Sequence, residues 1–373
     1  MESYGPDNLK EVKKMEKDFE IISSKYPYPK YSFNYKERIK RWKSSIEHNQ
    51  SFLNELIKIY KPPSSYYSGI DLDEITHSRF IEQNFIINVL IYTIRDWASE
   101  REEERQTNYN DIINEVIKHL PPEKNGKDKE RYKILIPGSA LNRLGYELVK
   151  YGYDVEGNDY LFLNAIFSDF IFNKTKKEMN SIYPFIYSFE GFWKEDDIFK
   201  KFSFPNIDID LKNNDKYGKF KMTIGDFISL YQNTKDYFDC VITCFFIDTA
   251  NNVIKYIDII YNILKKDGIW INFGPLSYHF SAFPNCVSIE LPYDKIKEVV
   301  INYGFEYLNE NFKITPFGHI DNNMHNEIFN CIYFYCFSFV FRCMYYFILR
   351  HRNVWLCYMT YVFFLISGDC KCF

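Results

Sequence analysis

The segment that decides the fold reads Ile134-Leu135-Ile136-Pro137-Gly138-Ser139-Ala140-Leu141-Asn142-Arg143-Leu144-Gly145. Its apolar start predicts a strand, the glycine a turn, and the residues after the turn a helix. A glycine at such a turn lets the backbone approach a ligand closely, and the helix N-terminus favours a polar or anionic group. Because Ala140 and Asn142 stand where a nucleotide-binding loop has further glycines, the loop alone is weak evidence for a ligand.

An acidic residue at the end of the next apolar run strengthens this interpretation. Asp159 follows Gly157 and Asn158 and stands 21 residues beyond Gly138. In a doubly wound sheet, an acid at this place accepts hydrogen bonds from the ribose hydroxyls of a nucleoside. The alternative is that Asp159 only caps the helix that follows it.

Around this loop, short apolar runs alternate with segments of helix length. The expected strands are residues 133–137, 155–158, 220–224, 238–246 and 268–274, and the helix-length segments include 144–151, 160–173 and 253–264. Such alternation predicts an α/β fold with a parallel sheet that helices cover on both faces. We expect residues 331–341 to form the last strand.

The N-terminal third has a different pattern, because its apolar residues recur at three- and four-residue steps. Residues 39–60 show this spacing, which predicts a long amphipathic helix after a shorter one. Pro62 and Pro63 break it, and further helices are expected over about 76–97 and up to Pro121. The charged run 101–105 between them is expected to be a solvated face.

These patterns divide the chain into three parts. Residues 1–122 form a helical region, residues 132–341 the α/β domain, and residues 342–373 an apolar tail of undecided status. One apolar run, residues 328–349, approaches the ~20 residues of a membrane helix, but Arg342 lies inside it. We therefore favour a final strand followed by a tail, with a membrane span as the second interpretation.

Composition and charge restrict the classes of function. The 373 residues carry 46 Lys and Arg against 50 Asp and Glu, a formal net charge of −4, so no overall positive charge attracts nucleic acid. The nine cysteines all follow residue 239 and form no CxxC pair, so we expect neither a disulfide framework nor a metal site. The N-terminus lacks the basic and apolar pattern of a signal peptide, so secretion is not expected.

Two further strand ends carry residues that suit an adenosine-like ligand. Asp226 and Phe227 follow the third expected strand, where the acid can accept from an adenine amino group while the ring lies against the base. Residues 243–250 end the fourth expected strand, which places Cys244 beside the ligand and Asp248 over the neighbouring pocket. The alternatives are that Phe227 belongs to the core and that Asp248 caps a helix.

Together, these motifs resemble those of the carnosine N-methyltransferase family. Its members use S-adenosylmethionine to methylate the imidazole of histidine-containing dipeptides, giving anserine. The resemblance covers about residues 35–341. The segments that carry it are Ser45-Ser-Ile-Glu-His-Asn-Gln-Ser-Phe52, Ile94-Arg-Asp-Trp97, residues 137–145, Gly157-Asn-Asp159, Gly225-Asp-Phe227, Asp239-Cys-Val-Ile-Thr-Cys-Phe-Phe-Ile-Asp-Thr-Ala250 and Gly268-Ile-Trp-Ile-Asn-Phe-Gly-Pro-Leu-Ser-Tyr-His-Phe280.

The resemblance implies a Rossmann-like, seven-stranded methyltransferase sheet whose cofactor is covered by the N-terminal helical region. It assigns to S-adenosylmethionine the residues Arg95, Gly138, Asp159, Asp226, Phe227 and Cys244, and to the catalysed step and the peptide substrate Asp248 and His279. Arg95 would hold the methionine carboxylate. Tyr92 enters the cofactor site where the family has a glutamine. The family's substrate tyrosines correspond most nearly to Phe317, Glu327 and Phe329, so their hydroxyls are lost.

The function that the resemblance implies is methyl transfer to an imidazole nitrogen of carnosine or a related small peptide. In this reaction Asp248 or His279 accepts from the other ring N–H, so that the reacting nitrogen keeps its lone pair. The expected partner is this peptide, with no nucleic acid and no membrane, and a homodimer is left open. The expected location is the cytoplasm, with the nucleus also open.

Two other classes of function remain as alternatives. A nicotinamide-dependent Rossmann oxidoreductase shares the glycine loop and the distant acid, although the loop lacks the second glycine. A non-catalytic, membrane-associated scaffold is suggested by the apolar tail and by the lost tyrosines.

Overall fold

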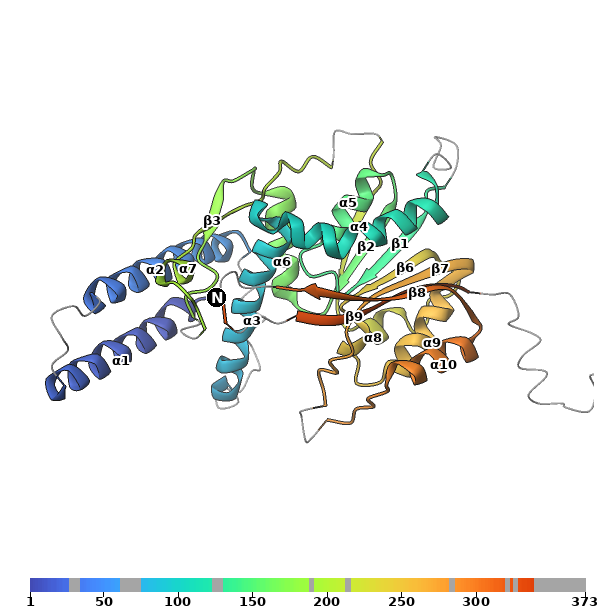
Figure 1. Ribbon diagram of the computed structural model, residues 1–373. Helices are drawn as coiled ribbons and strands as arrows, with labels where there is room; N and C mark the ends of the chain where they lie inside the picture. Colours follow the sequence, from blue (N-terminus) through green and yellow to red (C-terminus); the bar gives the residue numbers. More distant parts are fainter. Residues whose placement is uncertain are drawn as a thin grey trace, which may run out of the picture.

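A seven-stranded sheet forms the centre of the C-terminal two thirds of the chain in the computed structural model (Figure 1). The structure describes residues 1–26, 34–60, 75–122, 130–187, 191–211, 216–281, 286–318, 323–324 and 328–338, with the backbone alone for 75–84.

The strand order of the sheet is β5-β2-β1-β6-β7-β9-β8. The bounds of these strands are β1 Lys133–Pro137, β2 Asp154–Asp159, β5 Phe220–Ile224, β6 Phe238–Cys244, β7 Leu264–Gly274, β8 Phe305–Pro316 and β9 Ile328–Ser338. Neighbouring strands from β5 to β7 pair in parallel, which confirms the predicted α/β sheet. β9 is antiparallel to both β7 and β8, so the parallel pairing does not extend to this last strand.

Two details of the last strands also correct the prediction. The final strand begins at Ile328 rather than Cys331, because it pairs with β8 from Pro316 back to Phe305. β8 itself was not predicted, since it is an edge strand and most of its side chains face solvent. An antiparallel pair of consecutive strands needs no helical crossover, so nothing in the helix pattern indicates it.

Helices cover both faces of the sheet. Ile134 and Ile136 pack with α4 (Glu102–His119) and α5 on one face, and Leu135 packs with α9 and α10 on the other, as the alternation of side chains along a strand requires (Figure 1). The helices of this part are α5 Arg143–Lys150, α6 Phe162–Asn173, α8 Phe227–Tyr231, α9 Val253–Ile263 and α10 Tyr293–Tyr303, with the 3₁₀ turn η4 Ile247–Thr249.

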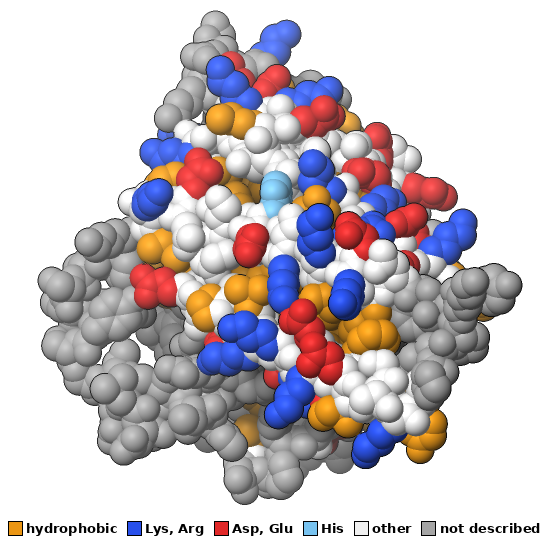
Figure 2. Space-filling view, turned by 90° about the vertical axis from the view of Figure 1, so that its left-hand side faces the viewer, with side chains coloured by type: hydrophobic (Ala, Val, Ile, Leu, Met, Phe, Trp, Pro, Cys, Tyr) orange, Lys and Arg blue, Asp and Glu red, His pale blue; other side chains and the backbone are white. Residues whose placement is uncertain are grey.

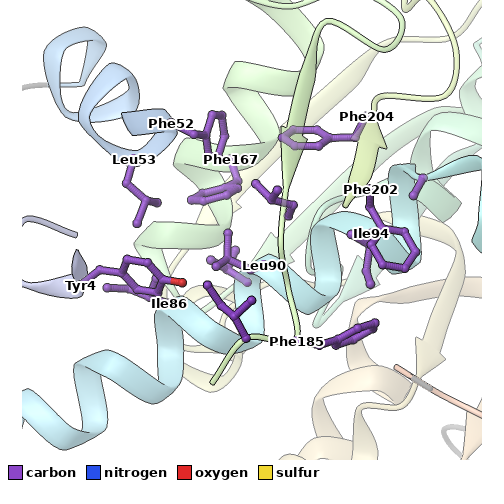
Figure 3. Packing of buried hydrophobic residues seen from close by; sticks show 14 of the residues in the cluster. Tyr4, Phe52, Leu53, Ile86, Leu90, Ile94, Phe167, Phe185, Phe202 and Phe204 are labelled. Carbon is purple, nitrogen blue, oxygen red and sulfur yellow. The ribbon is translucent and has the colours of Figure 1, made fainter. Parts of the chain in front are cut away.

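Four helices form the described part of residues 1–122, as their periodicity predicts. They are α1 Tyr4–Lys25, α2 Tyr35–Ile59, α3 Ile75–Trp97 and α4 Glu102–His119, with the 3₁₀ turn η2 Ser99–Arg101 before α4. An apolar core rich in aromatic residues lies between α2, α3 and α6 (Figure 3). A small sheet and a short helix of the α/β domain complete it, namely β3 Asn180–Ile182, β4 Phe202–Phe204 and α7 Glu195–Ile198. Phe52 is central to it, with edge contacts to Phe167, Phe170 and Phe204.

The segment from Ser45 to Phe52 binds α2 to the α/β domain. The Asn49 amide accepts from the backbone N–H of Tyr183 and donates to its carbonyl, both at 2.8 Å. It also donates to the hydroxyl of Tyr4 at 2.9 Å. Because Asn49 is fully buried, its amide must find such partners, and the motif therefore joins the two parts of the chain.

The charged run from Arg101 to Arg105 is a solvated face only in part, at Glu102 and Glu103. Arg101, Glu104 and Arg105 are all buried. Arg105 Nη1 donates to the carbonyls of Arg95 at 2.8 Å and Ala98 at 2.7 Å, so it satisfies acceptors that the C-terminus of α3 leaves open. The expectation fails at Glu104 and Arg105 because their hydrogen-bond partners are backbone groups that no sequence pattern displays.

The surface carries charges of both signs. Figure 2 shows the face at the α1 and α2 end, where Lys and Arg side chains lie among Asp and Glu side chains. Ion pairs join α2 to its neighbours here, with Lys43 bound to Glu16 of α1 and Arg41 to Asp196 of α7. The visible, described part of this face thus repeats the near balance of the whole chain.

No helix within the described residues is both long and apolar enough to cross a membrane. The tail assigned to residues 342–373 lies outside those residues. Since β9 ends at Ser338, we expect deletion of 342–373 to leave the cooperative unfolding transition of the protein in place.

Truncation after Tyr335 is the matched control for this prediction. It removes Cys336 to Ser338, which pair with β7 and β8, and should abolish cooperative unfolding in urea followed by circular dichroism. If the shorter deletion already abolishes the transition, the tail belongs to the folded domain.

Candidate active site

A cavity of about 820 Å³ opens at the carboxyl ends of β1, β2, β5 and β6. Ligands of doubly wound sheets bind at this edge. The predicted residues that line it are Tyr92, Arg95, Gly138, Asp159, Asp226, Phe227, Cys244, His279 and Phe317; among the described residues, Asp248 and Phe329 lie outside the lining. A second cavity of about 940 Å³ lies between α6 and the β5 edge and contains none of the predicted residues.

The loop after β1 forms a tight turn with a single glycine. Gly138 has a φ of +67°, and Ala140 and Asn142 also adopt left-handed backbone conformations, at 45° and 64°. These two residues therefore accept the strain that glycine would avoid. Gly157 on β2 makes room for the loop, because a Cβ there would lie 2.0 Å from Asn142 Oδ1.

Replacing Gly138 with alanine is expected to destabilise the protein by about 1–3 kcal/mol, from strain at positive φ and from overpacking. The added Cβ would lie 2.5 Å from Cδ2 of Phe246. Urea unfolding measures the effect. Ser139→Ala in the same loop removes a single side-chain hydrogen bond at 3.2 Å to Asn158 and should cost less than Gly138→Ala. Equal midpoints for wild type and Gly138→Ala would contradict the geometry.

Asp159 holds the loop rather than capping a helix. Its Oδ2 accepts from the N–H of Ala140 at 3.0 Å and its Oδ1 from the N–H of Leu161 at 2.9 Å. α6 begins only at Phe162, so the helix-capping alternative is wrong. Burial raises the pKa of the Asp159 carboxyl, and these hydrogen bonds and Asn164 oppose the shift.

Beside Asp159, the cavity wall contains a buried polar atom that lacks a partner. Asn164 is buried, lines the cavity, and its Oδ1 makes no hydrogen bond among the described residues. A buried acceptor without a partner costs about 1–3 kcal/mol unless a ligand or water satisfies it. Asp159 and Asn164 together therefore fit a ligand that offers hydroxyl donors.

Asp226 and Phe227 begin the short helix α8. Asp226 Oδ2 accepts from the N–H of Ser229 at 2.8 Å and caps the helix. The Phe227 ring packs against Phe246 and Tyr256 at centroid distances of 5.4 and 5.0 Å, so it belongs to the core while it also lines the cavity. An apolar ring beside an acceptor suits a flat base with an amino group.

Arg95 provides the positive charge of the cavity. It is buried at the end of α3 and donates from Nε to Asp96 Oδ1 at 2.8 Å and from Nη2 to Asp96 Oδ2 at 3.2 Å. Burial alone would lower the pKa of the guanidinium, but Asp96, Tyr109 and Tyr92 together outweigh burial and raise that pKa. Asp96 uses two of the five N–H donors, so the fork retains donors for a carboxylate.

The rings of Tyr92 and Phe317 enclose the guanidinium of Arg95. Their centroids lie 4.8 and 4.3 Å from its central carbon, within the range of cation–π contacts. Tyr109 donates its hydroxyl to Asp96 at 3.1 Å and lines the cavity beside them. Burial raises the pKa of Tyr109 well above its ordinary value, so this hydroxyl stays a donor.

The end of α3 is fixed to the loop after β1. Trp97 Nε1 donates to the carbonyl of Leu141 at 3.1 Å, and Arg143 Nη1 donates to the carbonyl of Asp96 at 2.9 Å. The segment from Ile94 to Trp97 thus places Arg95 against the cavity from outside the sheet.

Cys244 ends β6 at the floor of the cavity. Burial raises the pKa of its thiol to about 12, so the sulfur is an uncharged wall atom and not a nucleophile.

Asp248 and His279 meet after β6 and β7, but only His279 reaches the cavity. Asp248 is buried, and its Oδ2 accepts from the N–H of Ser277 at 2.9 Å while its carbonyl accepts from the N–H of His279 at 3.0 Å. Burial raises the pKa of the Asp248 carboxyl, with Ser277 and His279 opposing the shift. Because Asn252 caps α9, the alternative that Asp248 is that cap is wrong.

The two phenylalanines predicted for substrate binding lie in different layers. Phe317 is stacked on Phe245, with a centroid distance of 3.7 Å and an angle of 8°, and it lines the cavity. Phe329 makes an edge contact with Phe245, at a centroid distance of 5.7 Å, and does not line the cavity. Glu327 lies outside the described residues.

Sequence reasoning missed Asp96, Tyr109 and Asn164 at this site. Asn164 could have been found, because it interrupts the otherwise apolar stretch from Phe162 to Phe167. Tyr109 gave no usable signal in a chain with 19% aromatic residues. Within the described residues, no cluster of three or more His, Cys, Asp or Glu side chains could hold a metal ion.

The fold and the cavity together define the class of this protein. A strand order of 5-2-1-6-7-9-8 with one antiparallel strand, a glycine loop after β1 and an acid after β2 are those of a Rossmann-like, S-adenosylmethionine-dependent methyltransferase. The sequence profile of carnosine N-methyltransferase matches residues 72–339, and the chain belongs to this family.

Individual relatives agree with the profile. The chain is 32% identical over 337 residues to the carnosine N-methyltransferase of Rattus norvegicus, covering 89% of this chain and 82% of that one. It is 32% identical over 317 residues to that of Schizosaccharomyces pombe, covering 81% and 83%. Among solved structures, a methyltransferase of Methanosarcina mazei is similar with a TM-score of 0.38 and 12% identity, covering 57% of this chain and 94% of that one.

Proposed function

We propose that this methyltransferase transfers a methyl group from S-adenosylmethionine to an imidazole nitrogen of carnosine or a related histidine-containing peptide. The observation that carries the proposal is the single cavity in which Asp159, Arg95 and His279 meet. Membership of a methyltransferase family favours this activity over a nicotinamide-dependent oxidoreductase and over a non-catalytic scaffold.

The described residues fit S-adenosylmethionine along the whole cavity. Asp159 and Asn164 would accept from the ribose hydroxyls, and Asn164 Oδ1 would thereby gain its missing partner. Asp226 and Phe227 would receive the adenine. Arg95 would bind the methionine carboxylate. Gly138, which has no side chain, and Cys244, whose thiol is uncharged, would lie against the ligand.

Tyr92 would close the carboxylate end of the donor site. Its ring covers one side of the Arg95 guanidinium. Where the family has the amide of a glutamine, this chain thus has the apolar face of a ring. Screening Arg95 from water strengthens its attraction for a carboxylate. Bound S-adenosylmethionine supplies an electrophilic methyl group on a sulfonium.

The acceptor would be held on the His279 side of the cavity. We assign to His279 the acceptance of the N–H of the substrate imidazole, so that the opposite nitrogen keeps its lone pair. Asp248 would act behind it as a positioning residue, since it binds the backbone of Ser277 and of His279 itself. The task of these residues is to hold the nucleophile ~3–3.5 Å from the methyl group.

Phe317 and Phe329 bear on the choice of acceptor. Phe317 presents an apolar ring to the cavity and Phe329 supports it through Phe245. At these two positions the side chains offer no hydrogen bonds to a peptide, so we propose a broader range of imidazole acceptors than carnosine alone.

Calorimetry with S-adenosylmethionine and S-adenosylhomocysteine is the first test of this proposal. Binding of both, with none of a nicotinamide dinucleotide, is expected. Incubation with carnosine, other histidine dipeptides and a dipeptide without histidine then tests the acceptor, and methyl transfer to the last alone would overturn the imidazole assignment. The cytoplasmic or nuclear location and the homodimer stay predictions.

A further inference from the structure

Helix α4 holds two segments that contribute residues to the cavity wall, the end of α3 and the end of β8. On one side it binds the end of α3, where Arg105 donates to the carbonyls of Arg95 and Ala98 and Tyr109 donates to the side chain of Asp96. These contacts fix the residue that carries the positive charge.

On the other side, α4 binds the end of β8. Glu104 Oε1 accepts from the N–H of Gly318 at 2.7 Å. Asn108 Oδ1 accepts from the hydroxyl of Thr315 at 2.6 Å, and its Nδ2 donates to the carbonyl of Pro316 at 3.2 Å. Glu104 and Asn108 are four residues apart, so one face of the helix makes all three contacts.

Phe317 is the residue that these contacts enclose. Its side chain has no polar atom, so the backbone on either side, held at Pro316 and Gly318, determines where the ring lies. The ring stands 4.3 Å from the guanidinium carbon of Arg95 and 3.7 Å from the Phe245 ring. The two sides that α4 holds therefore meet in the contact between Arg95 and Phe317.

Because these groups are buried, losing their hydrogen bonds is costly. Glu104, Asn108 and Thr315 are 7%, 3% and 0% exposed. Hydrogen bonds to a buried carboxylate are stronger than those between neutral groups. Losing one leaves a buried donor or acceptor that water cannot satisfy. A displaced Phe317 would also open Arg95 to solvent, which weakens its attraction for an anion.

We propose that Glu104 and Asn108 are positioning residues that hold Phe317 over Arg95 and thereby form the subsite for the donor's carboxylate. The proposal rests on the proposed function in one respect, since it takes that carboxylate to bind at Arg95. Glu104 and Asn108 act through Phe317 and touch no ligand themselves.

A double-mutant cycle tests this coupling without any methyl acceptor. S-adenosylhomocysteine is titrated calorimetrically into the wild type, Glu104→Ala, Phe317→Ala and the double variant. If Glu104 acts through Phe317, each single change weakens binding about tenfold and the double change also about tenfold, rather than the hundredfold of independent sites. Glu104→Gln keeps an oxygen for the Gly318 N–H and should bind as the wild type does.

Two further variants keep the test decisive. Asn108→Ala repeats the cycle if Glu104→Ala does not fold. Asp111→Ala is the matched control, because Asp111 also joins α4 to β8, through Lys313, but away from Phe317; its binding should stay unchanged.

The outcomes separate the two proposals. No binding to the wild type overturns the proposed function. The positioning role is overturned if the wild type binds S-adenosylhomocysteine and the affinity losses of the two single variants add up in the double variant. It is also overturned if Glu104→Ala or Asn108→Ala loses no affinity.

Discussion

His279→Ala should lower single-turnover methyl transfer to an imidazole dipeptide about 100- to 10,000-fold, the usual contribution of a positioned acid or base. The dissociation constant of S-adenosylhomocysteine should change by less than about threefold, because the donor does not depend on this side chain. His279 is the residue of the pair with Asp248 that lines the cavity, and it is exposed enough that the protein keeps its fold without it.

Two variants of the same turn serve as comparisons. Ser277→Ala removes an exposed hydroxyl but keeps the backbone N–H that Asp248 binds, so turnover should be unchanged. Asp248→Ala leaves that N–H without its acceptor and should lower both turnover and stability, the latter by about 1–3 kcal/mol. Full turnover in His279→Ala, measured beside a thermal melt, would refute the proposed role of the histidine.

The sequence predicts those parts of the fold that local patterns determine. β1, β2 and β5 are buried or paired runs bounded by glycines, and their ends place Gly138, Asp159 and Asp226 at one edge of the sheet. β8 escaped prediction since an edge strand buries little of its side chains. The direction of β9 depends on pairing with β8, a non-local choice that its own residues do not encode.

The same distinction explains which site residues were missed. The charges at Glu104 and Arg105 read as part of a solvated run because their partners are the N–H of Gly318, 214 residues from Glu104, and carbonyls at the end of α3. Asp96 follows Arg95 directly, yet neighbours on a helix do not ordinarily face each other, so the pair could not be inferred. Contacts of this kind arise only when distant segments pack.

The largest effect on donor binding is expected from Asp159. Asp159→Ala removes the acceptor proposed for the ribose hydroxyls. Each hydrogen bond to a charged group contributes ~1.5–3 kcal/mol, so S-adenosylmethionine should bind roughly 10- to 150-fold more weakly. The change also frees the N–H groups of Ala140 and Leu161, which a thermal melt will register as lost stability. Weaker binding of the methyl donor would therefore have two candidate causes, the lost acceptor and a displaced loop.

A donor analogue without a ribose hydroxyl separates these two causes. If Asp159 binds the 2′-hydroxyl, the 2′-deoxy analogue of S-adenosylhomocysteine binds the wild type more weakly than the parent ligand does, and Asp159→Ala binds the two alike. If the loop alone is disturbed, Asp159→Ala weakens both ligands by the same factor and still discriminates between them. That second pattern, or an unchanged dissociation constant, would remove Asp159 from the ribose site, leaving Asn164 Oδ1 as the acceptor to test next.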